Sequence, residues 1–143
     1  MNLTFHIEFD GCCEEAFRVY ERCLGAKIVT MLKWSETPMA AEAPPGYADK
    51  ILHATLAIDG VDLAGADSMP DKYEAPRGFH VLLGVPDPAG AERVFAALSE
   101  GGNITVPMQK TFWSALYGTV TDRFGVSWEI NCEQPASDLP AAR

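Results

Sequence analysis

Residues 3–9 alternate strictly between apolar and polar side chains, with Leu, Phe, Ile and Phe at the odd positions. A period of two predicts a strand with one buried and one polar face. After Gly11 the apolar positions recur every three or four residues up to Leu24, which predicts an amphipathic helix. Gly25 follows at the position where a left-handed residue commonly ends a helix.

Three more strands are predicted in the first half, at residues 26–34, 51–58 and 61–67. The last two are joined by Asp59-Gly60, a pair typical of tight hairpins. The loop 34–49, between the strands 26–34 and 51–58, is rich in proline and alanine, and it is long enough to cover a cleft.

The second half repeats this order of elements. It predicts a strand at 79–85, a helix at 89–100, and strands at 103–107, 116–121 and 126–132. Apolar helix positions match between the halves: Ala16, Val19 and Tyr20 with Ala91, Val94 and Phe95. Matching glycines follow in the same order, which favours an internal duplication. We therefore predict an α+β fold of two β-α-β-β-β modules, residues 1–67 and 79–132, with a linker at 68–78 and a tail at 133–143, together one domain.

This architecture predicts where a site lies. A four-stranded sheet with one helix leaves its other face uncovered, so two such modules would combine their open faces into a cup. Inward-facing residues from both modules would then line one cleft.

Composition narrows the function further. The 143 residues are 48% hydrophobic, enough for a real core, and their net charge is −9. The basic residues form no run, which makes nucleic acid a poor partner. No apolar run approaches the ~20 residues that span a bilayer, and residues 1–10 do not resemble a signal peptide. We expect a cytoplasmic protein without a membrane partner.

The four cysteines show no C-x-x-C spacing and are interpreted as reduced thiols. Cys12 and Cys13 open the first helix, where the helix dipole favours a thiolate, but no base lies near them in the sequence.

Four motifs carry a family resemblance: F-D-G-x-C-x-E-A at 9–16, I-x-H-A-x-L at 51–56, M-x-x-T-F-W at 108–113 and D-R-F-G-V-x-W at 122–128. With the paired modules, they make residues 1–132 resemble the vicinal oxygen chelate superfamily, and within it the PhnB-like branch. The superfamily includes glyoxalase I, extradiol dioxygenases, and the fosfomycin and bleomycin resistance proteins. The resemblance implies a glyoxalase-like fold and a homodimer. Proteins of this branch often carry a demethylubiquinone methyltransferase label, but the sequence has no glycine-rich loop of the kind expected for an adenosyl cofactor.

The resemblance also implies four metal-ligand positions, which fall on Thr4, Ala64, His80 and Glu129. His80 and Glu129 suit a divalent metal such as zinc, nickel, manganese or iron, whereas threonine is a feeble ligand and alanine is none. His6 lies two residues beyond Thr4 on the same face. A set of two histidines and one carboxylate, His6, His80 and Glu129, would leave positions open for substrate, with Glu129 as the candidate catalytic residue.

A plainer interpretation stays open. A strand histidine is more often a hydrogen-bonded packing residue than a ligand, and Glu129 could accept a hydrogen bond from an arginine such as Arg123. The cleft would then be polar but free of metal.

Large aromatic side chains near the loops favour a pocket for a flat or apolar ligand, with core filling as the alternative for the tryptophans. The predicted pocket residues are Thr4, Trp34, His53, Phe112, Trp113, Tyr117 and Trp128. Two functions follow: a metal-assisted enzyme (lyase, isomerase, transferase or dioxygenase) acting on a small oxygen-rich substrate, or a metal-free protein that binds or sequesters a small molecule.

Overall fold

The computed structural model describes residues 1–134, 138 and 140–141. It divides into two compact units, residues 1–74 and 75–143, and the division falls inside the predicted linker. Of the predicted tail 133–143, residues 135–137, 139 and 142–143 lie outside the described residues.

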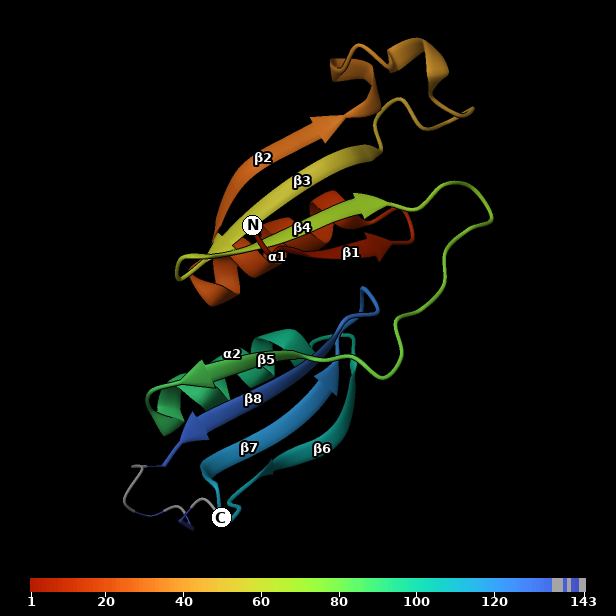
Figure 1. Ribbon diagram of the computed structural model, residues 1–143. Helices are drawn as coiled ribbons and strands as arrows, with labels where there is room; N and C mark the ends of the chain where they lie inside the picture. Colours follow the sequence, from red (N-terminus) through yellow and green to blue (C-terminus); the bar gives the residue numbers. More distant parts are fainter. Residues whose placement is uncertain (135–137, 139, 142–143) are drawn as a thin grey trace. The chain divides into compact units, whose positions relative to one another are not determined.

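The first unit is a four-stranded mixed sheet with one α-helix (Figure 1). Its strands stand in the order β1-β4-β3-β2, and β1 runs parallel to β4 while the other pairs are antiparallel. The elements are β1 (Phe5–Phe9), α1 (Cys13–Leu24), β2 (Lys27–Lys33), β3 (Ile51–Ile58) and β4 (Val61–Asp67), with short 3-10 helices η1 (Trp34–Glu36) and η2 (Ala40–Glu42) between β2 and β3.

The second unit has the same topology, in the order β5-β8-β7-β6 with β5 parallel to β8. Its elements are β5 (Val81–Val85), α2 (Pro88–Ser99), β6 (Asn103–Gln109), β7 (Ser114–Thr121) and β8 (Ser127–Glu133). The predicted repeat and fold class are therefore confirmed, and neither sheet closes on itself. The strands β1 and β5 each begin two residues later than predicted, after Thr4 and after His80.

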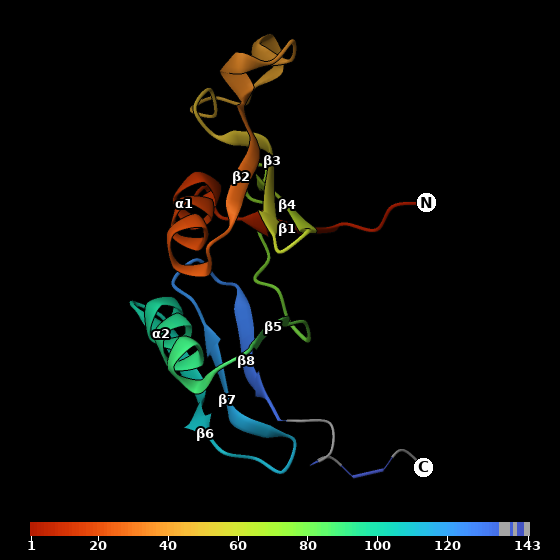
Figure 2. The same ribbon diagram turned by 90° about the vertical axis from the view of Figure 1, so that its left-hand side faces the viewer.

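Each helix covers one face of its own sheet (Figure 2). The helix positions matched between the halves are buried in both units. A strand glycine lets an aromatic ring of the helix approach closely: a Cβ added at Gly65 would lie 2.7 Å from Phe17 Cζ, and one at Gly118 would lie 2.9 Å from Phe95 Cε2. The core of each unit therefore lies between its helix and one sheet face.

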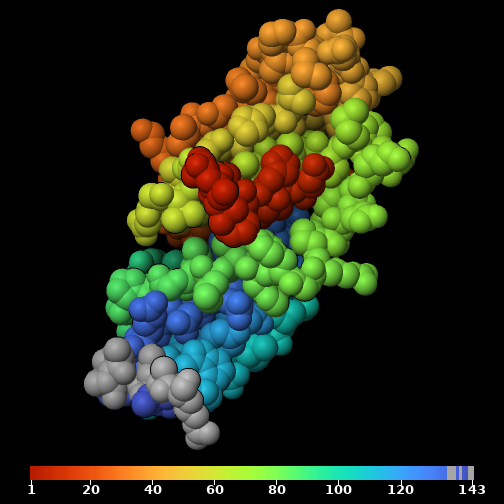
Figure 3. All heavy atoms as spheres, viewed as in Figure 1, coloured from red at the N-terminus to blue at the C-terminus, as the bar shows by residue number. Residues whose placement is uncertain are grey.

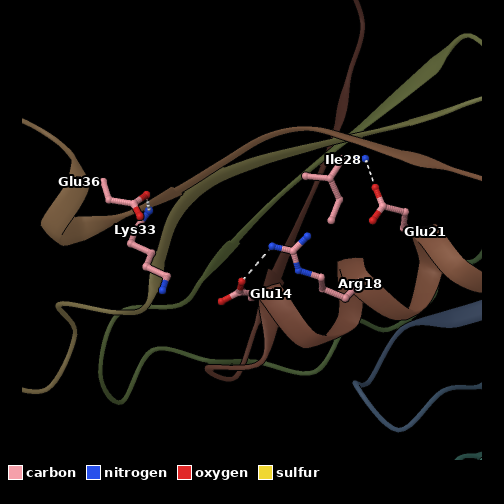
Figure 4. A network of polar contacts seen from close by, with 6 residues as sticks. All are labelled: Glu14, Arg18, Glu21, Ile28, Lys33 and Glu36. Atoms are coloured by element: carbon pink, nitrogen blue, oxygen red, sulfur yellow. Dashed lines mark hydrogen bonds and ion pairs between the residues drawn. The ribbon is translucent and has the colours of Figure 1, made fainter.

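Polar contacts fix the ends of α1 and β2 (Figure 4). Gly25 has φ 64°, which confirms the left-handed end of the helix. Just beyond it, the backbone N–H of Ile28 donates to Glu21 Oε2 at 2.9 Å. This bond holds the start of β2 against the last turns of α1.

The loop between β2 and β3 is held by its own hydrogen bonds. Trp34 N donates to Lys50 O at 3.1 Å, which extends the β2–β3 pairing into the loop, and the Tyr47 hydroxyl donates to Ser68 O at 2.9 Å. Figure 3 shows the loop, in orange, as a solid block of atoms at one end of the first unit. Trp34 is buried, so its ring packs inside this unit and does not line an open face.

The D-R-F-G-V-x-W motif builds a turn. Asp122 Oδ1 accepts hydrogen bonds from the backbone N–H groups of Phe124 and Val126, at 2.9 and 3.0 Å, and Oδ2 accepts one from Trp128 Nε1 at 2.9 Å. The buried carboxylate thus fixes the connection from β7 to β8. In the part of the chain that the structure describes, no helix is both long and apolar enough to cross a membrane.

Candidate functional site

The strand β8 divides its side chains between the two faces of the second sheet. Trp128, Ile130 and Cys132 are buried on the face that α2 covers, whereas Glu129 and Asn131 alternate with them on the open face. On the neighbouring strand β7, Thr119 stands opposite Glu129 and Tyr117 opposite Asn131. The open face of the second sheet therefore gathers polar side chains from both strands.

Glu129 and Tyr117 form a close pair on this face. The Tyr117 hydroxyl donates to Glu129 Oε1 at 2.5 Å. This hydrogen bond, with burial and the negative charge of the carboxylate adding to it, raises the pKa of Tyr117 to about 12. The phenol therefore keeps its proton at neutral pH. Arg123, the donor considered from the sequence, instead has its guanidinium 4.5 Å from the ring centre of Phe124.

Two further aromatic rings adjoin the ring of Tyr117. We call Phe112, Trp113 and Tyr117 the aromatic row. Phe112 and Trp113 meet at 4.9 Å between ring centres and 80° between planes, and Trp113 and Tyr117 at 5.4 Å and 71°. Phe112 is 70% exposed and Trp113 40%. The structure thus brings together three of the predicted pocket residues, next to Glu129.

The turn before β7 is closed by its own hydrogen bonds. Ser114 N donates to Thr111 Oγ1 and Thr111 N donates to Ser114 O, both at 3.0 Å. Ser114 is fully buried and its hydroxyl donates to Cys132 O at 2.8 Å. Phe112 and Trp113 are therefore carried by a backbone that is pinned at both ends.

Trp128 is not part of this face. Its side chain is 0% exposed and its indole N–H is bonded to Asp122. Strand parity explains this position, because Trp128 stands one residue from Glu129 and points to the opposite side of the sheet.

Further residues of the open face were missed in the sequence. The side-chain oxygen of Asn131 is buried and has no hydrogen-bond partner among the described residues. Leu82, opposite Glu129 on β5, is exposed. Gly84 stands opposite Asn131, and a Cβ added there would lie 3.1 Å from Glu133 Oε1. Strand parity with Glu129 was the signal that could have found Asn131.

The first unit presents a different open face. His6 stands opposite Ala64 on the neighbouring strand, and Leu82 stands opposite Glu129 in the same way in the second unit. Thr4 precedes His6 by two residues, and His80 precedes Leu82 by two residues. Thr4 and His80 therefore hold equivalent places in the two units. His6 Nε2 lies 3.7 Å from Glu8 Oε1. His53 is exposed, and its Nε2 lies 3.3 Å from Thr55 Oγ1.

A metal centre needs about three protein donors or more. Among the residues described, no group of three or more His, Cys, Asp and Glu side chains could hold a metal ion. Neither unit taken alone therefore offers three such ligands among its described residues. The set of His6, His80 and Glu129 draws on both units and stays a prediction.

The cysteines at the start of α1 are not activated thiols. Burial, with the negative charge of Asp67 adding to it, raises the pKa of both Cys12 and Cys13. The Asp67 carboxylate itself accepts hydrogen bonds from Cys13 N at 2.9 Å and Ile51 N at 2.8 Å. For the pKa of these thiols, desolvation thus outweighs the helix dipole, which would lower it. Asp67 has a structural role, because its carboxylate holds the backbone of both segments.

Comparison with known proteins decides the family. A model of the Glyoxalase/Bleomycin resistance protein/Dioxygenase superfamily matches residues 6–130. The chain belongs to this superfamily. It is 34% identical over 139 residues to protein YjdN of Escherichia coli strain K12, and the match covers 92% of this chain and 95% of YjdN.

Solved structures of other proteins share the fold of this chain. Protein PA1353 from Pseudomonas aeruginosa is 40% identical, with a TM-score of 0.85 over 94% of this chain and 99% of that chain. A PhnB protein from Bacillus cereus is 23% identical, with a TM-score of 0.79 over 92% of this chain and 99% of that one. Because one scaffold of this kind hosts many functions, the function has to be argued from the site.

Proposed function

We propose that this member of the glyoxalase superfamily binds a small organic molecule on the open face of its second sheet. The observation that carries the proposal is the aromatic row ending on the Tyr117–Glu129 pair. Ligand sites typically combine aromatic walls with a few placed polar groups, and this face has both. Phe112 and Trp113 would supply contact area, and Glu129 would fix the orientation of the ligand.

The pinned turn supports the proposal on energetic grounds. Ordering a loop and its side chains costs about 0.5–1.5 kcal/mol for each side chain immobilised on binding. The Thr111–Ser114 turn is hydrogen-bonded at both ends, and the ring of Trp113 is braced by the rings on either side. Part of the free energy of ordering this turn and its side chains has therefore been spent during folding and does not reduce the affinity for a ligand.

A fragment screen tests this function. Charged and neutral aromatic molecules are screened against the wild type by saturation-transfer NMR, and each hit is titrated against Trp113→Leu and Glu129→Gln. We expect Trp113→Leu to weaken the binding of every hit, and Glu129→Gln to weaken the binding of hits that carry a positive charge or a hydrogen-bond donor. Phe5→Leu, which alters an exposed ring of the first unit, should leave binding unchanged. Hits that bind Trp113→Leu and Glu129→Gln as well as the wild type would overturn the proposal.

A second candidate is a metal-assisted enzyme acting on an oxygen-rich substrate. It is favoured by His80 and Glu129, an imidazole and a carboxylate at places equivalent to Thr4 and Ala64 of the first unit. The resemblance to the superfamily implies metal ligands at these places. Calorimetry with zinc, nickel, manganese and, without oxygen, iron(II) tests it. We expect Glu129→Gln to weaken the metal far more than His53→Asn, and affinity to fall as pH drops through roughly 6 to 7, because a ligating imidazole must be neutral. Absence of binding, or an unchanged affinity in Glu129→Gln, leaves the metal-free function.

We further propose that the chain forms a homodimer in the cytoplasm. The outer strands β2 and β6 carry exposed apolar side chains, Val29 and Ile104. Exposed edge strands with apolar side chains favour pairing with another chain, and soluble oligomers are mostly symmetric dimers.

A further inference from the structure

We infer that the ligand of this face is a flat organic cation, which would lie against the aromatic row and direct its positive charge to Glu129. The inference rests on the proposed function and names the class of molecule. Three features of the second unit carry it: the free charge of the Glu129 carboxylate, the geometry of the rings, and the balance of charges around them.

The Glu129 carboxylate offers an uncompensated negative charge. Its Oε1 accepts the Tyr117 hydroxyl, a neutral donor, and no cationic side chain of the described residues forms an ion pair with it. A neutral hydrogen bond orients the carboxylate without cancelling its charge. Oε2 accepts no hydrogen bond from the described residues, so one oxygen is left for a ligand.

The rings suit a flat cation in particular. A cation within about 6 Å of an aromatic face is attracted by the ring, and tryptophan attracts it most strongly. Trp113 is partly exposed and meets each neighbouring ring at a steep angle, so the row forms two corners. A flat molecule lying on one ring would meet the edge of the next.

The charges around the rings favour a cation over an anion. Glu133 lies on the same strand as Glu129, and its Oε1 reaches over Gly84. Lys110 precedes the turn and is exposed, and Arg123 lies over Phe124. His80 is exposed ahead of β5. The two carboxylates of Glu129 and Glu133 outnumber the one nearby lysine, Lys110, so this face is negative. The whole chain has a net charge of −9.

Three probes of the same shape separate charge from shape: N-methylquinolinium, neutral quinoline and quinoline-2-carboxylate. They are titrated by calorimetry at pH 8 and low salt. We expect the cation to bind about tenfold more tightly than quinoline, and the carboxylate to bind least. Glu129→Gln should weaken the cation about tenfold and leave quinoline unchanged.

Matched variants keep the test sharp. Glu129→Asp keeps the charge and should keep most of the preference for the cation, and Glu92→Gln, on the exposed side of α2, removes one negative charge elsewhere and should change nothing. Quinoline binding as tightly as the cation, or an unaltered cation affinity in a folded Glu129→Gln, would overturn the inference and leave the proposed function standing. If none of the three probes binds, the cation inference fails, and the proposed function is then judged by the fragment screen alone.

Discussion

Replacing Glu129 by Gln should lower the pKa of Tyr117 from about 12 toward the ordinary tyrosine value near 10. The largest cause of the raised value is the 2.5 Å hydrogen bond to the carboxylate, which holds the proton on the phenol, and the charge of the carboxylate adds to it. Glutamine keeps the size of the side chain but removes the charge. Burial of the phenol is retained, so part of the shift should remain.

The change can be followed by the absorbance of tyrosinate at 295 nm during an alkaline titration. The chain has four tyrosines, so Tyr117→Phe identifies the transition by removing it. Circular dichroism at each pH restricts the comparison to folded protein. We expect a transition near pH 12 to be absent in Tyr117→Phe and to move to lower pH in Glu129→Gln.

The same pair sets the sign of a stability effect. The pKa of Tyr117 is higher in the folded protein than in the unfolded chain, so folding favours the protonated phenol. Its contribution to stability is complete below pH 10 and is lost as pH rises toward 12. The wild type should therefore lose stability more steeply over this window than Glu129→Gln. A transition near pH 12 that persists in Glu129→Gln, or equal slopes in the two proteins, would refute the role given to the carboxylate.

Three further predictions concern the scaffold and its assembly. Asp122→Asn should reduce the free energy of unfolding by about 2 kcal/mol, because the amide nitrogen of asparagine is a donor and would face either the indole N–H of Trp128 or the backbone N–H groups. Urea unfolding measures this loss, which should be smaller in a Trp128→Phe background that lacks the indole donor. Gly65→Ala should cost about 1–3 kcal/mol, since its Cβ would lie 2.7 Å from Phe17 Cζ, and Phe17→Leu in the same chain should restore part of the loss. Light scattering at micromolar concentration should give twice the chain mass, and a mass near 15.5 kDa would exclude the homodimer.

Much of the fold could be predicted from the sequence because its determinants are local. The alternation of residues 3–9, the helical spacing up to Gly25 and the Asp59-Gly60 hairpin depend on neighbours a few residues apart. The structure confirms the helix and the hairpin, and it confirms the strand over Phe5–Phe9. The repeat could also be predicted, because each unit buries the same helix positions. Parity along β8 likewise gives Glu129 a direction opposite to its neighbours before any coordinates are known.

Which side of a sheet becomes the core is a tertiary property, because it depends on where the helix packs. Trp113 and Trp128 are both large aromatic residues near the same strands, yet one is partly exposed beside Tyr117 and the other is buried under α2. The donor to Glu129 was equally hidden, because Tyr117 lies twelve residues away and reaches it only through the β7–β8 pairing. Cys12 shows the same limit: its place at a helix start suggested a lowered thiol pKa, but burial beside Asp67, 55 residues further along the chain, raises it. Burial and contacts between distant residues exist only once the sheet has formed, and these are what decide the chemistry of the face.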